Sequence, residues 1–110
     1  RGILGARLQD RTIEIPVPPS HVAQAGAPVT LGIRPEDLSL CDASEAWLTG
    51  ETVVVERLGG QTYAYIDVGA DRLLTVELPR TSEVAPGTVL SVNGRVDAIH
   101  VFAEGGNRLN

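Results

Sequence analysis

The 110-residue chain contains no methionine and no lysine, and its only cysteine is Cys41. Without a lysine it cannot build a Walker A loop, in which a lysine reaches the nucleotide phosphates. One cysteine closes no internal disulfide and supplies too few thiolates for a structural zinc site. We therefore expect a protein of a reducing compartment that is not itself a P-loop ATPase. The missing methionine and the lack of a signal peptide favour a domain excised from a longer chain.

Aromatic residues and long apolar runs are also scarce. The chain has four aromatic residues and no apolar run near the roughly 20 residues that a membrane-spanning helix needs. Its formal net charge is −5, from 14 acidic and nine basic residues, so its average field repels nucleic acid and anionic lipid. The length and the 43% hydrophobic content fit one globular domain over residues 1–110.

Period-two alternation of short apolar runs, separated by Gly, Pro, Asp and Asn, predicts an all-β fold of about eight or nine short strands with almost no helix. The polar stretch 9–11 is expected to turn the chain between the first two strands. Pro16, Pro18 and Pro19 are expected to end the second strand. Residues 20–25 could hold one helical turn, and residues 105–110 are expected to be loose. The core-facing positions of the first three strands are Leu4, Ala6, Leu8, Ile13, Ile15, Val17, Val29, Leu31 and Ile33.

The run from Trp47 to Leu58 predicts one long strand. Its centre, Val53 to Val55, is apolar on both faces, which leaves open a buried strand or a β-bulge, and leaves its inward face undecided. Glu51 and Glu56 are expected to point to opposite faces, because side chains alternate along a strand.

A hairpin follows this strand. Ala64, Ile66 and Val68 are expected to face the core together with Leu74, Val76 and Leu78, around a turn at 69–71. Tyr63, Tyr65 and Asp67 then lie on the opposite face. Further strands are predicted at Val89–Val92 and around Ile99 and Val101.

Four segments resemble one family in the same order. Residues 31–38, LGIRPEDL, resemble the G-I-R-P-E-[HD]-L signature in the C-terminal domain of ATP-binding subunits of ABC importers for maltose, glycerol 3-phosphate and related solutes. Residues 50–59, GETVVVERLG, resemble that family's G-E-V-x-V-V-E-x-L-G strand. Residues 62–68 resemble its T-x-x-Y-V strand, and residues 100–102, HVF, its closing H-L-F.

The resemblance implies an oligonucleotide-binding-like barrel of the kind called TOBE, acting as a regulatory and dimerisation domain. The implied partners are an upstream ATPase domain, a second copy of the subunit, the membrane subunits of the transporter and, as a further candidate, a regulatory protein. ATP and magnesium would bind the upstream domain, so this chain is expected to hold no cofactor and to be no enzyme. The implied location is cytoplasmic, at the inner face of the cell membrane.

Arg34, Pro35 and Glu36 are the first candidate functional residues. A planar arginine fork can hold a carboxylate or backbone carbonyls, and the neighbouring proline fixes the turn that aims it. These residues either stabilise the turn by a local ion pair or hydrogen bond, or contact the ATPase domain or a partner subunit. Tyr63, Tyr65 and Trp47 are candidate interface anchors, with ordinary packing as the alternative. No catalytic or metal-binding set is expected, because His21, His100 and Cys41 lie in no ligand or nucleophile pattern.

Two other functions are alternatives to the regulatory one. Related TOBE-type domains bind small oxyanions such as molybdate, and an arginine-bearing turn could serve that, although their duplicated pattern is missing here. Nucleic-acid binding on the barrel face needs stacking aromatics in a basic groove, which the acidic composition opposes.

Overall fold

The computed structural model is built almost entirely from antiparallel strands. It describes residues 2–9, 11–17, 26, 28–103 and 105–110, of which residues 2–4 are described by their backbone alone. In this part of the chain the only helical elements are 3-10 turns of three residues, so the all-β prediction is confirmed. None of them is long enough to cross a bilayer. The elements are β1 (Gly2–Leu8), β2 (Arg11–Val17), β3 (Val29–Gly32), η2 (Pro35–Asp37), β4 (Leu38–Leu40), η3 (Ala43–Glu45), β5 (Leu48–Arg57), β6 (Thr62–Asp67), β7 (Leu74–Leu78), β8 (Val89–Gly94), η4 (Val96–Ala98) and β9 (His100–Ala103).

Two compact units make up the chain. The first contains residues 1–34 and 95–110, and the second contains residues 35–94. The predicted helical turn at 20–25 lies outside the described residues, as do Pro18 and Pro19.

A two-stranded ribbon of β1 and β2 begins the first unit. The strands pair from Leu8 opposite Arg11 to Gly2 opposite Val17. The alternation holds, because Ala6 is buried on β1 and Ile13, Ile15 and Val17 are buried on β2. Pro16 does not end the strand as predicted but lies within it, opposite Ile3. In the described residues β1 is the only strand that pairs with β2, so Pro16 lies on an edge strand, where the missing N–H is tolerated.

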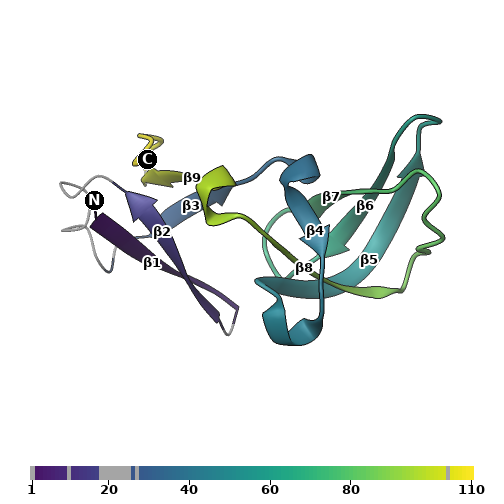
Figure 1. Cartoon of the computed structure of the whole chain (residues 1–110), viewed down its shortest axis with the longest axis horizontal. Coiled ribbons are helices and arrows are strands. Elements are labelled where there is room, and N and C mark those ends of the chain that lie inside the picture. The colour runs from purple at the N-terminus through teal and green to yellow at the C-terminus, as the bar shows by residue number, and fades with distance from the viewer. Residues whose placement is uncertain (1, 10, 18–25, 27, 104) are drawn as a thin grey trace. The chain divides into compact units, whose positions relative to one another are not determined.

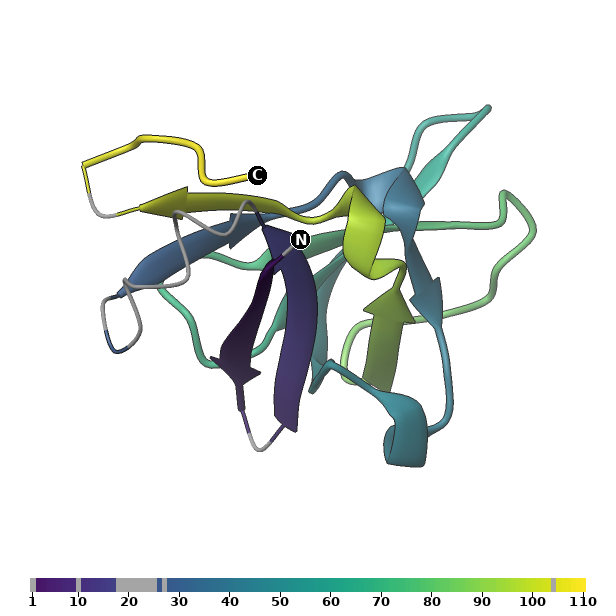
Figure 2. The ribbon, with the colours of Figure 1, turned by 60° about the vertical axis from the view of Figure 1, so that its left-hand side comes forward.

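The tail of the first unit is ordered, which corrects the prediction of a loose C-terminus. β3 pairs with β9, and residues 105–110 fold back along β9, as Figure 2 shows. The Leu109 N–H donates to the Val101 carbonyl oxygen at 2.7 Å, and the Val101 N–H donates to Oδ1 of Asn110 at 2.8 Å. Leu109 itself is only 7% exposed. The buried Leu109 side chain and the Asn110 side-chain amide, which accepts a hydrogen bond from the backbone of β9, hold the tail in place.

The second unit is a five-stranded sheet that curls into a nearly closed barrel. Its strand order is β4-β8-β5-β6-β7, and β4 also lies against β7, so the two ends of the sheet meet (Figure 1). The long strand β5 joins the two halves, pairing with β8 over Leu48–Glu51 and with β6 over Glu51–Arg57. This is the oligonucleotide-binding-like barrel that the sequence resemblance implied.

The interior of the barrel follows the predicted hairpin. Its buried side chains come from alternate positions of the strands, as period-two patterning requires. Leu74 and Val68, both predicted to face the core, are only half-buried, and Val68 lies just beyond the end of β6. The buried set of this unit is Leu38, Ala46, Thr52, Thr62, Ala64, Ile66, Val76, Leu78, Leu90 and Val92.

A β-bulge in β5 resolves the ambiguous run of valines. The β5–β6 register shifts between Thr52, opposite Ile66, and Val54, opposite Tyr65, leaving Val53 as the extra residue. Val53 and Val54 are 46% and 47% exposed, so the bulge prediction is confirmed and the buried-strand alternative is wrong. The inserted residue places two consecutive valines on the outer face of the sheet.

Candidate functional site

Arg34, Pro35 and Glu36 lie where the chain leaves β3. Pro35 begins η2, which leads directly into β4. The side chains of Arg34 and Glu36 are exposed, and neither makes a hydrogen bond or ion pair to another described residue.

Tyr63 and Tyr65 lie together on the outer face of β6. They alternate with Thr62, Ala64 and Ile66, which are buried in the barrel, and the two tyrosines are half-buried. Trp47 lies apart from them, just before β5, and its backbone N–H donates to the Val92 carbonyl oxygen.

The strand register gives these tyrosines defined neighbours. Tyr65 lies between Val54 on β5 and Thr75 on β7, whereas Tyr63 lies between Glu56 and Glu77. Side chains directly opposite one another on antiparallel strands are about 5 Å apart at Cβ and share a face. We call this surface the tyrosine face; it consists of Val53, Val54, Glu56, Tyr63, Tyr65, Thr75 and Glu77.

Two further carboxylates extend the tyrosine face at one end. Glu51 pairs with Asp67 on β6, and both are exposed. Asp67 follows Tyr63 and Tyr65 at alternate positions, so Glu51 and Glu56 lie on the same face, contrary to the prediction from simple alternation. The reason is the bulge. In a regular strand two residues five positions apart point to opposite faces, but the extra residue between Glu51 and Glu56 brings both side chains to the same face.

A hydrogen bond fixes Tyr65 within this surface. Its hydroxyl donates to Oε1 of Glu56 at 3.0 Å, along the diagonal between the two strands. That hydrogen bond to a carboxylate raises the pKa of Tyr65 above its usual value, and partial desolvation and the Glu56 charge act in the same direction.

The variant Glu56→Gln tests this bond. Removing the carboxylate should lower the pKa of Tyr65, because the neutral phenol loses a charged acceptor and the phenolate loses a repelling neighbour. A raised folded-state pKa favours the native state below the ordinary tyrosine pKa, and this contribution disappears as the pH rises through the folded value. Ultraviolet titration of the phenolate absorbance measures the shift. Glu45→Gln, an exposed carboxylate on η3, is the control and should leave the titration unchanged.

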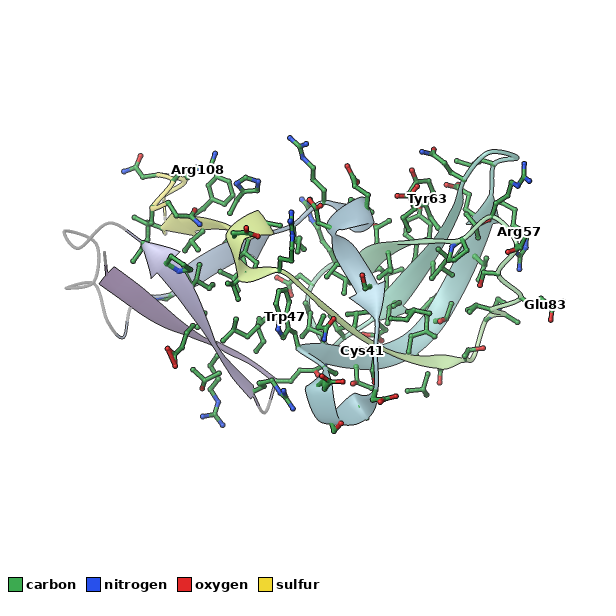
Figure 3. All side chains as sticks on the ribbon, viewed as in Figure 1. Cys41, Trp47, Arg57, Tyr63, Glu83 and Arg108 are labelled. Atoms are coloured by element: carbon green, nitrogen blue, oxygen red, sulfur yellow. The ribbon has the colours of Figure 1, made fainter. Side chains whose placement is uncertain are left out.

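Arg57 is a structurally important residue that the sequence analysis missed. Its guanidinium donates through Nη1 to the Ser82 carbonyl oxygen at 2.7 Å and through Nη2 to the Val84 carbonyl oxygen at 3.1 Å. Figure 3 shows Arg57 directed toward the loop that carries Glu83. This is the fork geometry that the sequence analysis considered for Arg34. No local pattern marks Arg57, because its acceptors are backbone groups about 25 residues away in sequence.

Replacing Arg57 by alanine should loosen the loop after β7. Each exposed hydrogen bond from a charged donor is worth on the order of 1 kcal/mol, so we expect a loss of about 1–2 kcal/mol in unfolding free energy. Arg57→Lys should recover only part of this, because an ammonium cannot bond both carbonyls in the fork geometry. Urea denaturation measures the change, with the exposed Arg72→Ala as control. If Arg72→Ala lost as much unfolding free energy as Arg57→Ala, the stabilising role of the Arg57 hydrogen bonds would be contradicted.

The described residues hold no group of three or more His, Cys, Asp or Glu side chains arranged to bind a metal ion. Cys41 is half-buried, and its backbone N–H bonds the Ser91 carbonyl oxygen across β4 and β8. What the structure does bring together is an outer sheet surface of tyrosines, valines and carboxylates, a composition suited to contact with a partner.

Comparison with known proteins agrees with this architecture. The TOBE domain family matches residues 31–102, which include the whole barrel unit and parts of strands β3 and β9. Three relatives are maltose/maltodextrin import ATP-binding proteins named MalK. The protein from Vibrio cholerae is 32% identical over 86% of this chain and 26% of its own length. The Salmonella typhi protein is 36% identical over 80% of this chain and 24% of its own length. The Yersinia pestis protein is 39% identical over 76% of this chain and 23% of its own length.

The chain thus spans about a quarter of the length of these relatives, in their C-terminal portion. The family match covers well over half of the chain and coincides with the strands that form the barrel. The chain belongs to the TOBE domain family.

Proposed function

We propose that this chain is the regulatory and dimerisation domain of the ATP-binding subunit of an ABC importer for sugars or glycerol 3-phosphate-like solutes. The observation that carries the proposal is the match of the whole barrel to the TOBE family, together with relatives named as maltose/maltodextrin import ATP-binding proteins. In this proposal ATP and magnesium bind an upstream ATPase domain, and the barrel supports uptake without catalysing a reaction.

The proposed setting is the cytoplasmic face of the cell membrane. There the domain would contact its own ATPase domain, a second copy of the subunit and, within the complex, the membrane subunits or a regulatory protein. Arg34 and Glu36 are proposed contact residues, because both are exposed and carry charges that no described residue engages. Nucleic acid is not a proposed partner, since the net charge of −5 repels phosphates.

The coding sequence that precedes Arg1 tests the proposal directly. It is expected to encode a P-loop lysine, an L-S-G-G-Q signature and a catalytic glutamate. A protein containing that region should hydrolyse ATP, whereas the present chain should bind no Mg-ATP in isothermal titration, because it has no lysine. Micromolar binding of Mg-ATP by this chain, or an upstream sequence without these motifs, would contradict the proposal.

Self-pairing of the isolated chain is expected to be weak. A symmetric interface that holds a dimer alone buries at least about 1,000 Å² around an aromatic or aliphatic centre. With four aromatic residues to divide between its core and all contacts, the chain should be mainly monomeric at micromolar concentration and dimeric only well above it. Sedimentation velocity across a concentration series measures this. A dimer that persists at nanomolar concentration would instead make this domain the principal dimerisation element.

A further inference from the structure

The tyrosine face is an outward sheet surface of the barrel unit with an unusual composition. The outward side of an antiparallel sheet is normally polar when it faces water. Here Val53 and Val54 are about half exposed at the centre of the barrel's longest strand, and Tyr63 and Tyr65 lie beside them. Aromatic side chains next to exposed apolar ones are the usual composition of a contact surface.

The charge on this surface has one sign. Glu56 and Glu77 lie on either side of Tyr63, and Glu51 and Asp67 continue the same face along β5 and β6. The outward positions of β5, β6, β7 and β8 that the register defines include no arginine or histidine. The nearby guanidinium of Arg57 is bonded to loop carbonyls. The four carboxylates therefore set the local potential.

Tyr63 is the residue where these features converge. Its hydroxyl makes no hydrogen bond to any described residue, unlike that of Tyr65, and the strand register places Glu56 and Glu77 opposite it on the two neighbouring strands. A guanidinium or ammonium placed over this ring would gain a cation–π contact and two charge-assisted partners at once.

We propose that the tyrosine face is the docking surface for an extended, arginine- or lysine-containing segment of a partner protein, with the cationic side chain bound at Tyr63 between Glu56 and Glu77. Apolar residues at alternate positions of that segment would cover Val53 and Val54. This assignment does not depend on the proposed role in sugar import.

A second copy of this chain is the wrong occupant for this surface. Two tyrosine faces brought together would align eight carboxylates, because Glu51, Glu56, Asp67 and Glu77 would each be doubled. Like charges that face one another across an interface cost several kcal/mol. Self-pairing must therefore use another part of the chain. A failure of the proposed dimer would leave the docking proposal intact, and a failure of docking would leave the proposed dimer intact. Nucleic acid and anionic lipid are disfavoured by the same carboxylates.

The test is a titration of the whole chain with a short peptide of alternating arginine and valine, followed by amide chemical shifts and by fluorescence anisotropy of the labelled peptide. The expected result is saturable binding, with the largest shifts on β5, β6 and β7, that weakens with added salt. A peptide with glutamate in place of arginine should not bind.

Variants separate a specific site from general attraction to an acidic protein. The double variant Glu56→Gln/Glu77→Gln and the single variant Tyr63→Ala should each weaken binding at least about tenfold, whereas Tyr63→Phe, which keeps the ring, should bind like the parent. The control Glu45→Gln/Asp71→Asn removes the same charge from exposed positions elsewhere in the barrel unit and should have little effect. Equal losses in both double variants, shifts away from the tyrosine face, or preferred binding of the glutamate peptide would overturn the proposal. Thermal melts of every variant confirm that the fold is retained, since all substituted positions lie on the outer surface.

Discussion

The variant Gly50→Ala is expected to destabilise the barrel by about 3 kcal/mol or more. A Cβ at Gly50 would overlap the Asp67 carbonyl oxygen and come within 2.8 Å of Cγ2 of Ile66. The first of these atoms belongs to the backbone of β6 and the second to a fully buried side chain, so neither can move aside cheaply. Overpacking of this kind typically costs 1–3 kcal/mol, and a clash with backbone lies at or beyond the upper end.

The position of Gly50 explains this sensitivity. β5 pairs with β8 before Glu51 and with β6 after it, and Glu51 itself pairs with both Val89 on β8 and Asp67 on β6. The strand has to coil tightly there, and a glycine at the bend lets β6 approach closely. For a domain of this size a loss of 3 kcal/mol lowers the melting temperature by roughly 10–25 °C.

Gly60→Ala is the matched control for this experiment. Gly60 lies in the turn between β5 and β6 of the same unit, where an added Cβ meets nothing within 4 Å and the backbone is not in the left-handed region. Differential scanning calorimetry of both variants measures the contrast. Equal melting temperatures for Gly50→Ala and the parent would show that β5 and β6 are not as closely packed as this structure has them.

Most of the barrel could be predicted from the sequence because its interior depends on alternation alone. Ala64, Ile66, Val76 and Leu78 are buried as the period-two pattern requires. The failures have physical reasons. The three-residue strand β4 (Leu38–Leu40) is too short to show an alternation, and Pro16 lies within a strand because it occupies an edge.

The composition of the tyrosine face could be predicted only in part. Alternation places Tyr63 and Tyr65 outward, but their neighbours Glu56 and Glu77 depend on the register of three strands, which turn lengths and one bulge determine. Three consecutive valines give no signal for the position of an extra residue, so the sequence could not show that Glu51 and Glu56 share a face. Arg57 was missed for a similar reason, because its acceptors are main-chain carbonyls in a distant loop.

The C-terminal tail supplies the second prediction with a large effect. Leu109→Ala should cost about 2 kcal/mol or more, because the side chain is 7% exposed and large-to-small substitutions in cores cost 2–5 kcal/mol. Once the leucine no longer anchors the tail, the Asn110 amide should also release its bonds to the Val101 N–H and to the Ile99 carbonyl oxygen, which measure 2.8 and 2.6 Å.

Amide hydrogen exchange reports this release at individual residues. The N–H groups of Val101 and Ala103, which donate to Asn110 and Asn107, should exchange at least about tenfold faster in Leu109→Ala, since 1.4 kcal/mol corresponds to a factor of ten in an opening equilibrium. Arg108→Ala is the control, because the Arg108 side chain is exposed and its pairing with Phe102 is a backbone bridge that alanine preserves. Amides in the barrel unit should keep their protection in both variants. If Val101 exchanges equally fast in the parent and in Leu109→Ala, the tail does not hold the edge of β9, and the loose C-terminus expected from the glycines and asparagines of its sequence would be the better description.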